Sequence, residues 1–181
     1  NLIGSNNIQS ILSIDKGSIW IGTYDAGVYA LSSNQLQFQK LQDLYSTDLV
    51  NLSESATAFY QDHSGNLLLG TPAGFVKIDP SSGQSMEIGF DQCQKLMSGS
   101  KVLSILETHD EHLLIGTYDG GMGYFTKNLE HIKTFYPFGI EGQEQNISFL
   151  YNLPDHRVLV NSMYKGMVAM DLQTGSATPQ D

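Results

Sequence analysis

The sequence predicts an all-β fold assembled from four copies of one small unit. The stretch SIWIGTYDAGVYAL at residues 18–31 returns almost unchanged as HLLIGTYDGGMGYF at residues 112–125. Alignment on the Gly-Thr pair puts four residues in one column: Gly22, Gly70, Gly116 and Asn161. Their spacings of 48, 46 and 45 residues indicate tandem structural repeats. Alternating apolar and polar residues between Gly-, Asp- and Asn-rich turns indicate that each repeat is built of strands.

Each unit opens with an alternating strand and a tight polar turn. We expect these strands at residues 8–14, 56–62, 101–108 and 146–153. The turns that follow read DKGS, HSGN, HDEH and PDHR, and such clusters of turn-forming residues suit hairpins.

The second strand of each unit is apolar on both faces. We expect these strands at residues 19–23, 67–71, 113–117 and 158–162. A strand of this kind is predicted to lie inside the unit, sandwiched between neighbours. Trp20 fills the slot that Leu68 and Leu114 occupy elsewhere, which predicts a core position between units.

Structural roles are also predicted for the Gly-Thr pair that ends this strand in the first three units. A glycine there lets the chain turn or lets another backbone approach closely. The threonines are expected to form hydrogen bonds near the turn. The residues concerned are Gly22, Thr23, Gly70, Thr71, Gly116 and Thr117.

Two further strands complete each unit. The third strands are expected at residues 27–32, 74–79, 121–126 and 166–171, and the weaker fourth strands at 36–42, 85–90, 131–137 and 175–180. Short connections favour an antiparallel meander, and a four-stranded meander every 45 residues or so is typical of β-propeller blades. We therefore predict one partial β-propeller over residues 1–181, part of a larger ring, with blades near 7–43, 54–90, 100–137 and 145–181.

Charge and composition narrow the classes of partner. Nine Lys and Arg against 19 Asp and Glu give a net charge of −10, which disfavours nucleic acid and anionic membranes as partners. The sequence has no apolar run of membrane-spanning length. Its single cysteine, Cys93, cannot form an internal disulfide. We expect a segment of a longer protein, without direct membrane contact of its own.

The string IQSILSIDKGSIWIGTYDAGVYALS at residues 8–32 resembles the two-component regulator propeller repeat. The first unit matches through residues that include Ser10, Gly17, Trp20 and Gly27. The second and third units match through their own Gly-Thr pairs. The fourth departs most, because Asn161 and Ser162 stand where Gly-Thr is expected.

This resemblance implies a function. Such repeats form the extracytoplasmic sensor region of hybrid two-component systems, notably in gut Bacteroidetes, and many members respond to oligosaccharides released from glycans. The resemblance therefore implies a periplasmic, non-catalytic sensor segment whose parent is a histidine kinase.

One rim of a propeller carries the connections between second and third strands and the loops between blades, and binding sites concentrate on such loops. A tyrosine beside a carboxylate suits a sugar, because the ring stacks on the sugar and the carboxylate accepts hydroxyl hydrogen bonds. The candidate ligand-binding residues are Tyr24, Asp25, Tyr45, Tyr118, Asp119, Tyr164 and Lys165. The long loops at 43–55, 90–100 and 137–145 add Asp48, Phe90, Asp91, Phe138 and Glu141. The tyrosines could instead pack on the next blade while the aspartates cap turns.

Other chemistry has weaker support in the sequence. Four histidines fall in the first hairpin turns, on the opposite rim: His63, His109, His112 and His156. We expect these turns to lie too far apart to share a metal ion, so we predict no metal site and no cofactor. No nucleophile elbow or phosphate-binding loop occurs, and no pair of acids suggests glycoside cleavage.

Three functions remain open at this stage. The first is a sensor of a glycan-derived small molecule. The second is a propeller scaffold that binds another protein, and the third is a propeller lyase or hydrolase. Because an open arc leaves apolar blade faces exposed, the remaining blades of the parent or a second copy of the chain are expected as partners.

Overall fold

The computed structural model describes residues 3–14, 17–31, 38–41, 55–99, 101–141 and 143–180, and it contains four antiparallel four-stranded sheets. The first sheet comprises β1 (Ile8–Ile14), β2 (Ser18–Thr23), β3 (Val28–Leu31) and β4 (Phe38–Lys40). The second comprises β5 (Ala58–Gln61), β6 (Leu67–Thr71), β7 (Gly74–Ile78) and β8 (Ser85–Gly89). The third comprises β9 (Val102–Glu107), β10 (Leu113–Thr117), β11 (Met122–Phe125) and β12 (His131–Phe135). The fourth comprises β13 (Ile147–Asn152), β14 (Val158–Ser162), β15 (Gly166–Met170) and β16 (Ala177–Gln180). The predicted all-β fold of four-stranded meanders is confirmed.

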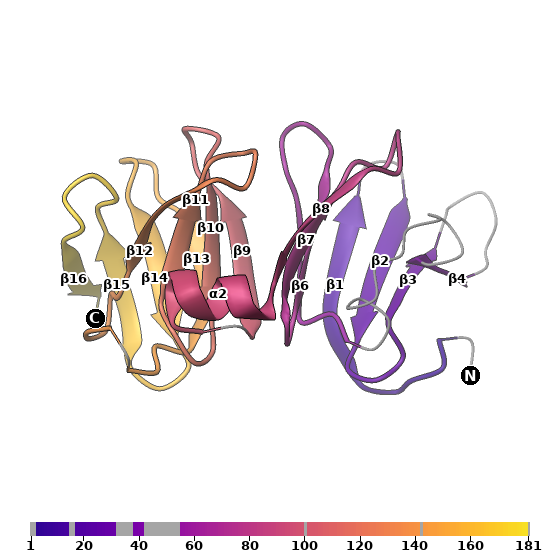
Figure 1. Ribbon diagram of the computed structural model, residues 1–181, viewed down its shortest axis with the longest axis horizontal. Coiled ribbons are helices and arrows are strands. Elements are labelled where there is room, and N and C mark those ends of the chain that lie inside the picture. Colours follow the sequence, from indigo (N-terminus) through magenta and orange to yellow (C-terminus); the bar gives the residue numbers. More distant parts are fainter. Residues whose placement is uncertain are drawn as a thin grey trace.

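The four blades form an open row in chain order. The first blade lies at the right of Figure 1 and the fourth at the left, and the two chain ends lie at opposite ends of the long axis. Neighbouring blades meet through their first strands, because β1 contacts β5, β5 contacts β9, and β9 contacts β13. We call each boundary between two neighbouring blades a seam.

The glycine column explains how closely the blades approach at the seams. A Cβ atom at Gly22 would come within 2.6 Å of the Phe59 ring in the second blade. A Cβ atom at Gly116 would come within 2.6 Å of the Ile147 side chain in the fourth blade. Gly70 is similarly close to Val102. Glycine is therefore required at these positions because the next blade's first strand occupies the space of a side chain.

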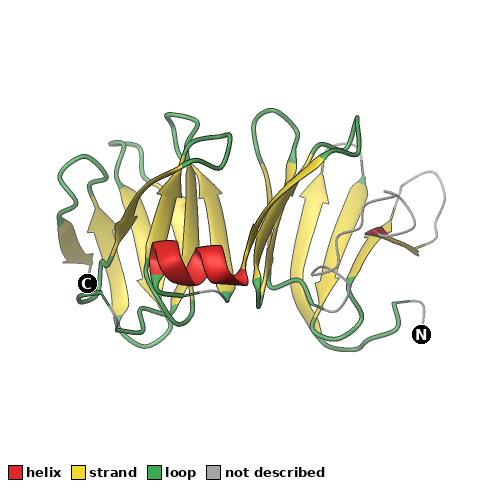
Figure 2. Ribbon diagram, viewed as in Figure 1, coloured by secondary structure: helices red, strands yellow, loops and turns green. Residues whose placement is uncertain are grey.

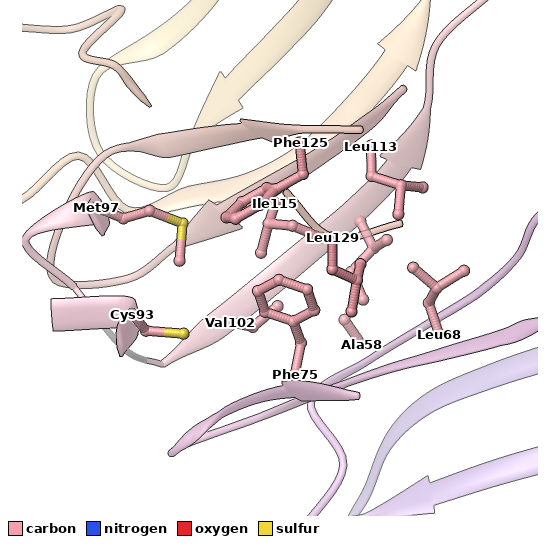
Figure 3. Packing of buried hydrophobic residues seen from close by; sticks show 11 residues of the cluster. Ala58, Leu68, Phe75, Cys93, Met97, Val102, Leu113, Ile115, Phe125 and Leu129 are labelled. Carbon is pink, nitrogen blue, oxygen red and sulfur yellow. The ribbon is translucent and has the colours of Figure 1, made fainter. Parts of the chain in front are cut away.

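Trp20 lies at the first seam and is 7% exposed. It packs in one apolar cluster with Leu67, Leu69 and Val76 of the second blade. The seam between the second and third blades is closed by a larger cluster, shown in Figure 3, in which the rings of Phe75 and Phe125 meet edge to face at 5.4 Å.

A short helix completes that second cluster. Helix α2 (Phe90–Met97) lies between β8 and β9 in the chain and packs beside the strands of the third blade (Figure 2). The prediction of a loop over 90–100 is wrong for this stretch. Cys93 and Met97, four residues apart on one helix face, are both fully buried. Burial, and to a lesser degree Asp119, raises the pKa of the Cys93 thiol to about 12.

The outer face of the fourth blade, which has no neighbouring blade in this chain, differs from the faces that pack at the seams. Asn161 stands in the glycine column, and its Nδ2 donates to Ser148 Oγ at 2.9 Å. Beside it the rings of Phe149 and Tyr151 lie parallel, with centroids 6.5 Å apart, and the two side chains are 50% and 56% exposed. The first blade likewise exposes 63% of Ile11. Among the described helices, none has the length and apolar character needed to cross a membrane.

Candidate functional site

Main-chain hydrogen bonds join the third and fourth blades along the rim that holds the connections between second and third strands, here named the loop rim. Tyr118 N donates to Lys101 O at 2.8 Å, and Asn146 N donates to Tyr118 O at 3.0 Å. Asn146 O in turn accepts from Met163 N at 3.0 Å. Residues of two blades therefore share one continuous surface on this rim.

The threonines of the repeat hold the loops of this rim in shape. Each hydroxyl donates to the carbonyl of the glycine at the far side of its loop, Thr23 to Gly27 at 2.8 Å, Thr71 to Gly74 at 3.0 Å and Thr117 to Gly121 at 2.7 Å. The threonines themselves are buried. The three threonines therefore close their loops through equivalent hydrogen bonds.

Tyr118 and Tyr164, from different blades, lie together on the loop rim. The pKa of Tyr118 is raised above its usual value, chiefly by electrostatic interaction with Tyr164 and then with Glu144. The Lys101 ammonium lies 5.0 Å from the centre of the Tyr118 ring, within range of a cation–π interaction. Tyr164 is 72% exposed. The pair thus forms an open aromatic and acidic surface across the third seam, here named the tyrosine patch.

Asp119 and Lys165 flank the tyrosine patch but serve partly to hold loops. Asp119 accepts weak hydrogen bonds from Lys101 N and Gln94 Nε2, each at 3.4 Å. Lys165 Nζ donates to Phe138 O at 3.2 Å. Both residues therefore link their loop to a neighbouring segment.

Tyr24 and Asp25 lie elsewhere, on the first blade at the other end of the row (Figure 1). Tyr24 N donates to Asn7 O at 2.9 Å, and Asp25 accepts a hydrogen bond from the Ser5 hydroxyl. Tyr45 and Asp48 fall outside the described residues. The candidate residues that the structure describes are thus divided between the first blade and the tyrosine patch.

The remaining loop candidates are also dispersed. Phe90 and Asp91 belong to the first turn of α2 and are exposed. Phe138 is half-buried, while Glu141 is exposed.

The opposite rim, here named the turn rim, carries the first hairpin turns of the blades. His63 Nδ1 lies 2.5 Å from Glu107 Oε2, and the rings of His109 and His156 meet at 5.3 Å between centroids. Side chains of neighbouring blades therefore touch at these two places. The blades converge enough at their first strands for the turns to meet. Even so, no group of three metal-binding side chains gathers among the residues that the structure describes.

A pocket of about 520 Å³ opens on the turn rim at the third seam. Its walls come from the first turn of the third blade and from two turns of the fourth blade. Among its lining residues are Tyr124, Asn152, Asp155, His156, Arg157 and Asp171. Arg157 pairs with Asp155 at 2.7 Å, and this hydrogen bond holds the pKa of Asp155 below its usual value. None of these residues was a sequence-based candidate for ligand binding, and His156 was considered only as a metal ligand, although the charged turns HDEH and PDHR stand in adjacent units.

Comparison with known proteins gives similarity in structure but not in sequence. No protein-family model matches the chain, and no curated protein matches it. Among solved structures, the extracellular domain of a putative hybrid two component system from B. thetaiotaomicron is 17% identical, with a TM-score of 0.71. That match covers 98% of this chain and 22% of the other.

Two further solved structures show the same fold. The extracellular domain of a second putative hybrid two component system from B. thetaiotaomicron is 20% identical, with a TM-score of 0.66, over 91% of this chain and 21% of that one. A catalytically inactive virginiamycin B lyase from Staphylococcus aureus, solved with Quinupristin, is 10% identical, with a TM-score of 0.71, over 97% of this chain and 55% of the lyase. The chain thus spans about a fifth of the length of the two extracellular domains that it resembles.

Proposed function

We propose that the chain is a non-catalytic, ligand-binding segment of the periplasmic sensor region of a hybrid two-component system, and that it recognises a glycan-derived oligosaccharide. Two lines support this assignment: the repeat resembles that of such sensors, and the fold is shared with extracellular domains of two of them. The observation that carries the ligand-binding role is the tyrosine patch, in which residues of two blades meet on one exposed surface.

The chemistry of the tyrosine patch suits a sugar. Tyr118 and Tyr164 offer aromatic faces on which the apolar face of a sugar ring can stack. The Tyr118 phenol, whose pKa Tyr164 and then Glu144 raise above its usual value, can donate a hydrogen bond. The nearby carboxylate of Glu144 can accept hydroxyl hydrogen bonds.

The placement of the tyrosine patch also suits signalling. A ligand switches a receptor only when it binds two arrangements with different affinity. An oligosaccharide held by Tyr118 and Tyr164 would contact two blades at once and would favour one arrangement of the third seam. The open faces of the first and fourth blades are the surfaces on which further blades of the parent, or a second copy, would pack.

A thermal-shift experiment with a panel of oligosaccharides tests the proposal. At 100 times its dissociation constant, a matching oligosaccharide is expected to raise Tm by roughly 5 °C or more. Tyr118→Ala and Tyr164→Ala should remove the shift. Tyr24→Ala, which alters the same Tyr-Asp pair in the first blade, is the matched control and should retain it.

The other outcomes separate the competing functions. Silence of the wild-type protein across the panel would count against sensing and favour a protein-binding scaffold. Chromatographic detection of a cleaved panel member would favour an enzyme. The fold shared with the virginiamycin B lyase is the reason for including this test.

A further inference from the structure

Each seam of the fold has an equivalent position on the turn rim, but the three positions are occupied differently. The equivalence follows from the hairpin hydrogen bonds, since Asp62 N, Thr108 N and Leu153 N donate to the fourth residue after them. At the second seam, a buried ion pair lies at this position. Lys77 Nζ lies 2.7 Å from Asp62 Oδ2 and also donates to Lys127 O at 3.0 Å.

The first and third seams are hollow at this position. The first-seam pocket, of about 390 Å³, is lined largely by uncharged groups such as Ile14, Trp20 and Pro80. The third-seam pocket, of about 520 Å³, is lined mainly by polar and charged side chains. Equivalent positions therefore differ in their lining, and the third-seam pocket has more charged residues in its walls than the first-seam pocket.

Asn152 forms part of the wall of the third-seam pocket. Its Nδ2 donates to Glu107 O at 2.8 Å, which fixes the orientation of the amide. Its Oδ1 is buried and has no hydrogen-bond partner within the described parts of the chain.

The fourth-blade turn adds donors and a ring. Arg157 binds Asp155 through Nε and one Nη, each at 2.7 Å, and a guanidinium has five N–H groups. His156 adopts a left-handed backbone conformation, with φ of 63°, and its ring reaches the ring of His109. Such a conformation is unusual for a residue with a side chain.

The balance of charge selects the class of ligand. The pocket has three carboxylates, Asp110, Asp155 and Asp171, and one guanidinium, so an anion would be repelled. It also presents donors and acceptors side by side, together with the Tyr124 ring. We propose that the third-seam pocket is a second ligand site, distinct from the tyrosine patch, for a neutral polyhydroxylated molecule of about disaccharide size. Its volume lies within the usual range for small-molecule sites.

NMR titration with maltose, lactose, cellobiose and sucrose tests this site without reference to signalling. We expect saturable shifts of the Asn152 side-chain amide and of the Arg157 Nε–H with at least one of these sugars. The Gln61 side-chain amide, which lines the first-seam pocket, should not shift. Glucuronate, as an anionic comparator, should bind at least tenfold more weakly.

Two variants with a matched control test the same site. Arg157→Ala and His156→Gly should each weaken sugar binding at least tenfold, and glycine suits the left-handed backbone at His156. Glu111→Gly changes the equivalent left-handed residue of the third-blade turn, with φ of 59°, and should leave binding unchanged.

The contrary results are distinct from those for the proposed function. The pocket assignment is overturned if none of the four sugars gives saturable shifts at Asn152 and Arg157, or if Gln61 shifts equally. It is also overturned if glucuronate binds best. Binding that Tyr118→Ala removes but Arg157→Ala and His156→Gly retain would overturn the pocket and support the tyrosine patch.

Discussion

Asp62 shows how this fold accommodates a buried charge. Its side chain is 2% exposed and lies 2.7 Å from the Lys77 ammonium. Burial alone raises the pKa of Asp62, but hydrogen bonds from Lys77 and Asn66 lower it more, and the net pKa lies below 3.8. Lys77 also reaches the third blade through Lys127 O, so the pair supports the second seam.

Asp62→Asn is therefore expected to destabilise the protein at neutral pH. Removing one partner of a buried ion pair costs about 3 kcal/mol or more, because the Lys77 charge is left uncompensated. Since the folded-state pKa of Asp62 is depressed, its contribution is complete above the unfolded value near 3.8 and is lost as pH falls through the folded value. Urea unfolding at pH 7 and near pH 3 measures both effects.

Asp155→Asn is the matched control, since it removes a solvent-exposed ion pair with Arg157. A control effect as large as that of Asp62→Asn, or a difference between wild type and Asp62→Asn that grows on acidification, would contradict the assignment.

At the same scale, the Tyr-Asp pair shows what residues alone can and cannot predict. The sequence presents Tyr24-Asp25 and Tyr118-Asp119 as equals, and their loops are closed by equivalent threonine hydrogen bonds. Tyr118 differs from Tyr24 because it interacts with Tyr164, which belongs to the next unit. A contact between units depends on the seam geometry, which no single repeat encodes.

At the scale of the element, the strands were predictable because each carries its own period-two pattern between turn residues. The core strands β2, β6, β10 and β14 begin and end within one residue of the expected ranges. Helix α2 was not predicted, because it spans only eight residues and begins at Gly89, which has no side chain to cap it, although Cys93 and Met97 fall at helical spacing. It is stabilised by the tertiary cluster of the second seam rather than by its own sequence.

The glycine column yields a prediction about the seams. Gly116→Ala places a Cβ atom against Ile147 of the fourth blade and should cost about 1–3 kcal/mol through overpacking. Asn161 stands in the same column on the fourth blade and already has a side chain. Asn161→Ala should therefore lower the free energy of unfolding by less. Thermal unfolding of the two variants measures the contrast.

Equal losses of stability for the two substitutions would mean that the glycine is needed for the backbone conformation of its own strand. The close approach of neighbouring blades would then not be the reason for glycine at Gly116.

At the scale of the whole molecule, the open row leaves two unpartnered faces. Phe149, Tyr151 and Ile11 are each at least half exposed on the outer faces of the end blades. Apolar surface of this kind is typical of an interaction site. We expect the isolated chain to self-associate as its concentration rises, with the two aromatic residues contributing.

Analytical ultracentrifugation of the double variant Phe149→Ser, Tyr151→Ser checks this expectation, and the dissociation constant should rise at least tenfold. Ile140→Ser is the matched control, because Ile140 is 67% exposed on a loop and not on a blade face. An unchanged constant in the double variant would show that association, if present, uses another surface.

The third-seam pocket also belongs to this scale, and this explains why the sequence did not reveal it. Thr108 and His109 line one wall and Asp171 another, more than 60 positions away in the chain. Each turn, taken alone, reads as a solvated hairpin. The hollow appears only when two blades are placed side by side.

The open row has a consequence for how the protein loses structure. Among the described residues, the first strand of each blade contacts the first strand of its sequence neighbours, so the blades support one another in a linear order. The second and third blades each pack against a neighbouring blade on both faces, whereas each terminal blade packs against a neighbour on one face. Amide hydrogens of β6 and β10 should accordingly exchange with deuterium most slowly, and opening should spread inward from either extremity.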